Sequence, residues 1–182
     1  GGQVARTPTS TGELDAFDET LILSDGAVTD DELSAALEGL RAGTLLLALD
    51  SCNSGGFARD LIDRPGRMGL FSSDEDVLSD TAEPRRAGGY LSWYLRRGVL
   101  GDADARPGDG VLMAGELTDY IHDGFVRDND LMNPPGSGDP AQRLIVQRGS
   151  LAWGHMLWAY PRSAEGRRIP MSDLPLTSPP PF

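Results

Sequence analysis

The most reactive side chain in this sequence is its single cysteine, Cys52, which closely follows an apolar run. A thiol there can attack a peptide carbonyl if the pKa of the thiol is lowered or if a base lies beside it. Gly55 and Gly56 would let the main chain turn sharply and leave backbone N–H groups free to face that carbonyl. Free cysteines are also among the most buried residue types, so a structural Cys52 is the alternative.

An aspartate, Asp50, stands two residues before the cysteine, at the end of the apolar run. A carboxylate at the end of a buried strand is costly unless it has a task. Asp50 therefore favours a functional site over a structural cysteine.

The element that must position both residues is the run 44–49, which is apolar at nearly every position and does not alternate. This pattern is typical of a parallel strand buried on both faces. Ligands of open parallel sheets bind beyond the carboxyl ends of the strands, which is where Asp50 and Cys52 lie. Further strands are predicted over 20–23, 67–71 and 142–147, and helices over 30–41, 90–99 and 114–126. The alternation of strands and helices predicts an α/β fold with a mainly parallel sheet.

Composition fits one globular domain, predicted over 1–160, followed by a Pro-rich tail over 161–182 that we expect to dock on the domain or on a partner. A net charge of -12 argues against nucleic acid as a partner and favours cationic ones. One cysteine excludes an internal disulfide, and no apolar run is long enough to span a membrane. We therefore expect a cytoplasmic protein with no membrane partner.

The segment from Asp50 to Gly55, Asp-Ser-Cys-Asn-Ser-Gly, resembles the Asp-x-Cys-x-Ser-Gly signature of metacaspases, which are caspase-like cysteine peptidases of clan CD. Gly1-Gly2-Gln3 resembles the three residues after the catalytic histidine in the family motif Ser-Gly-His-Gly-x-Gln. Other segments match in the same order, at 18–21, 28–33, 71–76 and 88–91. The segment 28–33 favours metacaspases over separase-like and CHAT-type peptidases. The resemblance covers about 1–147 and implies a caspase-like fold, with a mainly parallel central sheet flanked by helices, whose N-terminal strands are missing from this chain.

The resemblance also implies roles for single residues. Cys52 would form the thioester acyl-enzyme, and the backbone N–H groups of Gly1 and Cys52 would form the oxyanion hole. Asp50 would line the S1 pocket and pair with an Arg or Lys of a protein or peptide substrate, through two charge-assisted bonds in the case of Arg. Asn53 stands where the family commonly has His, which we interpret as a minor departure.

A base for the cysteine is not evident in the sequence. The family's catalytic histidine would directly precede Gly1, so we expect an N-terminal fragment that carries it as a partner. His122 and His155 occupy no family position, and their neighbours predict a surface or capping role for the first and a packed or interfacial role for the second. The alternative is a catalytically inactive caspase-like module that binds partners through its pocket.

The acidic residues Asp15, Asp30, Asp31 and Asp60 come from segments that this fold would bring together, and Ca²⁺ requires oxygen ligands from several loops. The resemblance implies a calcium site at these four residues, in which Asp18 is an alternative to Asp15. Asp30 and Asp31 would otherwise simply favour a helix N-terminus. A second acidic stretch, 102–110 followed by Glu116, is similar to an EF-hand loop but lacks two ligands, which predicts a plain turn before a helix.

Overall fold

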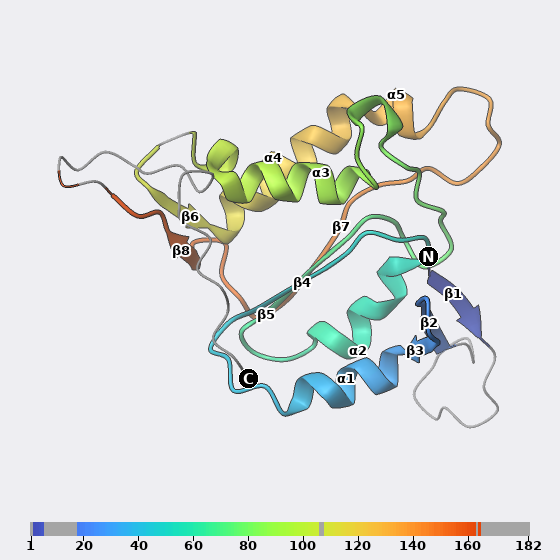
Figure 1. The fold of residues 1–182 in the computed structure, drawn as a ribbon, viewed down its shortest axis with the longest axis horizontal. Helices are drawn as coiled ribbons and strands as arrows, with labels where there is room; N and C mark the ends of the chain where they lie inside the picture. The colour runs from blue at the N-terminus through green and yellow to red at the C-terminus, as the bar shows by residue number, and fades with distance from the viewer. Residues whose placement is uncertain (1, 6–17, 106–107, 163, 165–182) are drawn as a thin grey trace.

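The computed structural model of this chain describes residues 2–5, 18–105, 108–162 and 164 (Figure 1). Gly1, Asp15 and nearly all of the predicted tail, 161–182, therefore lie outside the described residues. Within the described part, no helix is long and apolar enough to cross a membrane.

The central sheet contains three strands in the order β4-β5-β7, with bounds Leu45–Leu49, Arg67–Phe71 and Ile145–Gly149. β4 and β5 are parallel, whereas β5 and β7 are antiparallel. The predicted α/β class is confirmed, but the sheet is mixed rather than mainly parallel. The chain reaches β7 at the carboxyl end of β5, where the Gln142 amide donates to the Ser72 carbonyl at 3.1 Å, so β7 must run back along its neighbour.

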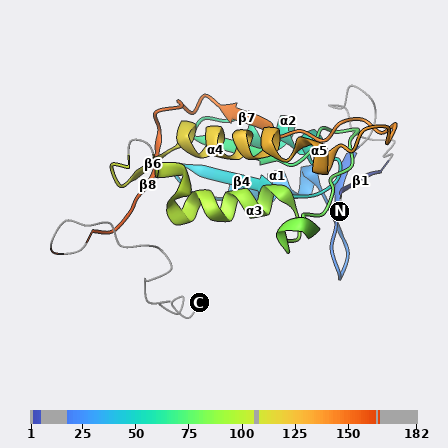
Figure 2. The same ribbon diagram turned by 90° about the horizontal axis from the view of Figure 1, so that it is seen from above.

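Helices cover both faces of this sheet (Figures 1 and 2). Along β5, Met68 and Leu70 pack into the cluster formed with α3 (Tyr90–Arg97) and α4 (Ala114–Arg127). Phe71 belongs to a second cluster, which includes residues of α2 (Ala58–Ile62) and leucines of α1 (Asp30–Glu38). Successive side chains of β5 thus point to opposite faces of the sheet, and both faces are buried.

β4 contacts both clusters, as its apolar run predicts, yet each of its five residues is only half-buried. The reason is its place in the sheet, because among the described residues β4 pairs with β5 alone. Its carboxyl end is nevertheless fixed firmly by the parallel pairing of Leu49 with Phe71.

Smaller elements surround this layered core. Two antiparallel sheets are formed by β1 (Gly2–Ala5), β2 (Asp18–Ile22) and β3 (Ala27–Thr29), and by β6 (Val111–Met113) and β8 (Met156–Ala159). Short helical turns lie at Ser54–Phe57, Glu83–Arg85, Gly98–Asp102, Ala103–Ala105 and, as α5, Asn129–Met132.

Most predicted elements exist with shifted ends. The helix predicted over 30–41 ends at Glu38, and its capping box is confirmed, because the Thr29 side chain accepts from the Glu32 N–H while the Glu32 carboxylate accepts from the Thr29 N–H. The predicted strand 67–71 is observed with the same bounds. The strand predicted at 142–147 begins only at Ile145 and is not the last one, since β8 follows it.

Candidate active site

Cys52 lies just beyond the carboxyl end of β4, as the sequence predicts, and its side chain is half-buried. The chain then reverses at Asn53, whose φ of 58° and ψ of 20° are left-handed. Asparagine tolerates this conformation better than most residues, and such strained positions often occur at functional sites. The Asn53 side chain holds the turn by donating to the Glu75 carbonyl at 2.6 Å. Asn53 thus has a structural role that the motif resemblance did not indicate.

A segment that follows β5 lies directly against the thiol. The Ser79 N–H donates to Cys52 Sγ at 3.3 Å, and Sγ lies 3.7 Å from the Ser79 carbonyl oxygen. One residue further along the cysteine loop, the Asn53 N–H donates to the Val77 carbonyl at 2.9 Å. The Ser79 N–H therefore orients the sulfur and would donate to the negative charge of a Cys52 thiolate.

Three hydroxyls fix the backbone immediately before Cys52. The hydroxyl oxygens of Ser72, Ser73 and Ser79 lie 3.1, 3.2 and 2.9 Å from the Ser51 carbonyl oxygen, and those of Ser72 and Ser79 bond each other at 2.7 Å. Ser72 and Ser73 follow β5 directly and are fully buried. Sequence reasoning did not assign these serines, although the motif match over 71–76 passes through two of them.

Gln142 connects this segment to a distant part of the chain. Its amide oxygen accepts from the Asp80 N–H at 2.8 Å, and its amide nitrogen donates to the Ser72 carbonyl at 3.1 Å. The Asn133 side chain in turn bonds both the N–H and the carbonyl of Gln142, at 2.6 and 2.9 Å. Gln142, which is 3% exposed, thus holds both ends of the 72–80 segment.

The two glycines after Cys52 have a purpose other than the predicted one. Neither Gly55 nor Gly56 has a positive φ, and the sharp turn is made by Asn53 instead. A Cβ on Gly55 would lie 2.8 Å from the Ser73 carbonyl oxygen, and one on Gly56 would lie 2.1 Å from a carboxylate oxygen of Glu19. These glycines allow close packing beneath the cysteine rather than a free backbone in front of it.

Asp50 is half-buried beside the N-terminus of α3. Its Oδ2 accepts from the Ser92 N–H at 2.7 Å, and a Cβ on Gly89 would lie 2.1 Å from the same oxygen. A carboxylate at this end of a helix accepts hydrogen bonds from the unpaired N–H groups of the first turn. The sequence did not reveal this capping contact, which gives Asp50 a structural role beside the predicted substrate-binding one.

Neither histidine of the described residues stands beside the thiol. The His155 ring Nε2 lies 2.7 Å from Thr44 Oγ1, at the start of β4, whereas Cys52 follows its end, about 16 Å away along a five-residue strand. His122 is an exposed residue of α4 whose Nδ1 lies 3.8 Å from Asp123. His122 is thus a surface residue, as predicted, whereas His155 is half-buried and bonded to Thr44.

Three of the four predicted calcium ligands lie close enough to interact. Asp30 is 1% exposed, and its Oδ1 accepts from the Asp31 N–H at 2.9 Å, whereas its Oδ2 accepts no hydrogen bond from the described residues. Burial raises the pKa of Asp30 and outweighs the hydrogen bonds with the Asp31 N–H and the Glu19 side chain, which lower that pKa, while the nearby charges of Asp60 and Asp31 raise it further. Within the described part of the chain, however, no three acidic, His or Cys side chains are grouped so that they alone could hold a metal ion.

Of the EF-hand-like stretch the structure describes 102–105 and 108–110, with a short helical turn at Ala103–Ala105, and the strand β6 lies between this stretch and α4, so the predicted turn does not lead directly into a helix. Asp104 is buried, and its carboxylate accepts from the Gly110 N–H at 3.0 Å. Glu116, which would be the last ligand of such a loop, accepts from the Met113 N–H at the start of α4.

A buried ion pair secures the connection that leads into α3. Asp128, which is 3% exposed, accepts bonds from the Arg85 guanidinium at 3.0 and 2.5 Å and from the Tyr94 hydroxyl at 2.7 Å. Burial alone would raise the pKa of Asp128, but the hydrogen bonds from Arg85 and Tyr94 outweigh it and lower that pKa. Burial, together with the bond to Asp128, raises the pKa of Tyr94 to about 12. The pair holds the chain that carries Gly89 toward Asp50.

Asp128→Asn should lower the free energy of unfolding by about 3 kcal/mol at pH 7, because it leaves the partly buried Arg85 without a charged partner. The folded-state pKa of Asp128 lies below its unfolded value, so this contribution is complete above about pH 4 and is lost as the pH falls through the folded pKa. Urea denaturation between pH 3 and pH 8 measures both effects.

Asp102→Asn is the matched control for this prediction, because Asp102 pairs with Arg97 at an exposed position. Its loss should cost about 0.5 kcal/mol. Equal costs for the two variants across the pH range would show that the Asp128 pair does not stabilise the fold.

No protein-family model matches this chain, and no curated protein matches it. The proposal of a function therefore rests on the geometry around Cys52 together with the motif resemblance.

Proposed function

We propose that this protein is a caspase-like cysteine endopeptidase that cleaves polypeptides after Arg or Lys. The observation that carries the proposal is the setting of Cys52, a half-buried thiol at the carboxyl end of a parallel strand with the Ser79 N–H 3.3 Å from its sulfur. A structural cysteine would not require this frame of serine hydroxyls and Gln142 around it.

In the proposed reaction, Cys52 Sγ attacks the carbonyl carbon of the scissile peptide and a base takes the thiol proton. The C–N bond then breaks, and the base returns the proton to the leaving amine. Water hydrolyses the thioester and restores the thiol. The N–H groups of Cys52 and Gly1 would stabilise the oxyanion.

The base is proposed to be a histidine from a polypeptide segment outside these 182 residues, as the motif resemblance implies. His155 and His122 do not offer an alternative, because one is bonded at the other end of β4 and the other is exposed on α4. We place the protein in the cytoplasm, where a single reactive thiol stays reduced.

Specificity is proposed to come from Asp50. Its carboxylate would pair with the basic side chain that precedes the cleaved bond, while its contact with Ser92 holds it in place from the side of α3. The overall charge of -12 favours the approach of such substrates.

The second candidate function is a non-catalytic module that binds basic segments of partners at the same place. One observation favours it: no histidine among the described residues lies by the thiol. This module would bind basic peptides but leave them intact.

A matched peptide series that differs only at P1, with Arg, Lys, Asp or Leu, separates the two functions. The protein with its histidine-bearing segment present should hydrolyse the Arg and Lys peptides. Binding of these peptides without cleavage would support the module, and preferred cleavage after Asp would contradict the assignment of Asp50.

We further propose that Asp30, Asp31 and Asp60, together with Asp15, hold Ca²⁺. The buried Asp30 Oδ2 and the nearby carboxylates of Asp31 and Asp60 both fit a place for a cation among oxygen ligands. Calorimetric titration after chelation should show a site whose affinity falls about tenfold or more in Asp31→Asn.

Glu38→Gln is the control for the calcium prediction, since Glu38 lies at the other end of α1 and pairs with Arg64. It removes the same charge without changing a proposed ligand. An absence of binding heat, with the same thermal unfolding midpoint in Ca²⁺ and in chelator, would show that these acids are structural.

A further inference from the structure

A hollow of about 270 Å³ is lined in part by the segment that contacts the candidate nucleophile. Two of its lining residues, Leu78 and Asp80, flank Ser79, whose N–H contacts the Cys52 sulfur. A substrate that lies along the segment 78–80 can therefore place a side chain in this hollow. The other walls come from the last residue of α5, Met132, and from the loop after it, with Asn133, Pro134, Ser137, Asp139, Pro140 and Gln142.

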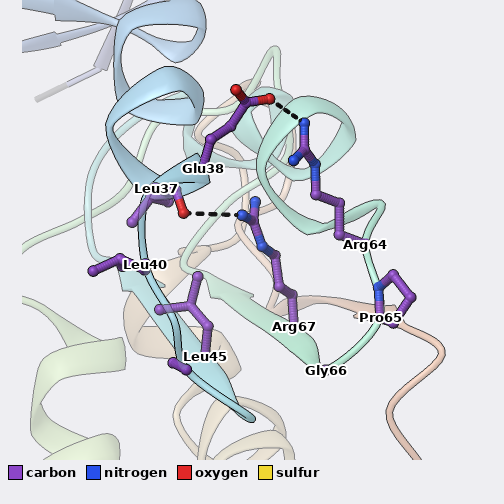
Figure 3. A pocket seen from close by; sticks show the side chains of 9 residues that line it. Leu37, Glu38, Leu40, Leu45, Arg64, Pro65, Gly66 and Arg67 are labelled. Atoms are coloured by element: carbon purple, nitrogen blue, oxygen red, sulfur yellow. Dashed lines mark hydrogen bonds and ion pairs between the residues drawn. The ribbon is translucent and has the colours of Figure 1, made fainter.

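A second hollow of the same volume differs in both place and chemistry (Figure 3). It lies at the amino ends of β4 and β5, away from Cys52, between α1 and the start of β5. Its charged groups bond one another or the backbone: Arg64 pairs with Glu38, and Arg67 donates to the carbonyls of Leu37 and Leu61. That hollow offers no comparable use for a ligand.

The first hollow combines apolar walls with uncompensated negative charge. Leu78, Met132 and two prolines supply the apolar surface, and Leu78 is 67% exposed. Asp80 and Asp139 are exposed carboxylates, and no Arg or Lys is among the residues that line the hollow. A long side chain with an aliphatic stem and a cationic end matches both features, because its stem covers the apolar wall while its head remains near the carboxylates and water.

One wall of the hollow is fixed before any ligand arrives. Gln142 and Asn133 line the hollow and bond each other, and Gln142 also bonds Ser72 and the Asp80 N–H. A site whose walls are already ordered loses less entropy on binding and can discriminate between side chains.

We propose that this hollow binds a second basic side chain of the substrate, so that the protein selects polypeptides with two basic residues only a few positions apart. This inference rests on the proposed function, in which Asp50 binds the first basic side chain at P1. Asp80 and Asp139 are the residues that give the hollow its preference for a cation.

The test uses peptides with Arg fixed at P1 and with Arg, norleucine or Glu placed in turn at each neighbouring position. At one position Arg should raise kcat/KM about fivefold to tenfold over norleucine, as expected for two partly exposed charge pairs, and Glu should lower it. In Asp80→Asn/Asp139→Asn this ratio should fall to about two or less.

Asp119→Asn/Asp123→Asn is the control, because both residues are exposed acids of α4 outside the hollow and the change in net charge is the same. The control should keep the full ratio. A ratio that falls equally in both double variants would overturn the inference and assign the preference to overall charge.

Two further outcomes distinguish this inference from the proposed function. Hydrolysis after Arg with no preference at any neighbouring position would overturn the inference about the hollow and leave the peptidase proposal standing. If no peptide is hydrolysed, calorimetric binding of the same peptides to Cys52→Ala decides: tighter binding of the doubly basic peptide supports the hollow without the peptidase, and equal binding overturns it.

Discussion

Cys52→Ala should lower peptide hydrolysis by about 10⁴-fold or more, because the variant has no atom that can form the thioester. The substitution removes one half-buried sulfur and leaves the hydroxyls on the Ser51 carbonyl in place. The thermal unfolding midpoint should therefore change by only about 2–4 °C. Both are measured on the protein with its histidine-bearing segment present.

Cys52→Ser separates nucleophilicity from packing. Its hydroxyl can still accept from the Ser79 N–H, yet it is a far weaker nucleophile than a thiolate at neutral pH. Hydrolysis should be almost as low as in Cys52→Ala. Full turnover in either purified variant would end the thiol-peptidase proposal.

Asp50→Asn should lower kcat/KM for Arg substrates by several hundredfold, since loss of one partner of a desolvated charge pair typically costs about 3–5 kcal/mol. This substitution separates the charge of Asp50 from its contact with α3. The asparagine oxygen can still accept from the Ser92 N–H, so the cap of α3 is kept and the free energy of unfolding should fall by about 1 kcal/mol or less.

Asp50→Ala completes this comparison, because it removes both the charge and the cap. It should lose the same activity as Asp50→Asn and in addition lose about 1–2 kcal/mol of stability. A preference for Arg over Leu at P1 that survives in Asp50→Asn would show that Asp50 only caps α3 and that another group binds the substrate.

These two roles of Asp50 bear on how the candidate site is built. The carboxylate stands between a strand end and a helix start, and Gly89 has no side chain that would push it away. The Asp128 ion pair with Arg85 anchors the turn before Gly89. A residue that binds a substrate cation is thus held by the backbone of α3, which fixes its orientation before binding.

Features with local signals could be predicted from the sequence. A continuous apolar run located β4 and placed Cys52 beyond its carboxyl end, and the Thr29–Glu32 capping box located the start of α1. These signals are reliable because strand burial and helix capping depend on residues within one short segment. Asp50 and Cys52 were therefore found as neighbours of a strand end.

The residues that surround the thiol became evident only in the tertiary structure. Ser79 and Gln142 were not predicted, because their contacts join residues 27 and 70 positions apart and no local pattern indicates such pairs. The Asp50 contact with Ser92 spans 42 positions, and β7 runs antiparallel because the chain returns at the carboxyl end of β5. Sequence spacing locates a nucleophile on its strand, whereas the long-range hydrogen bonds that orient it exist only once the chain has folded.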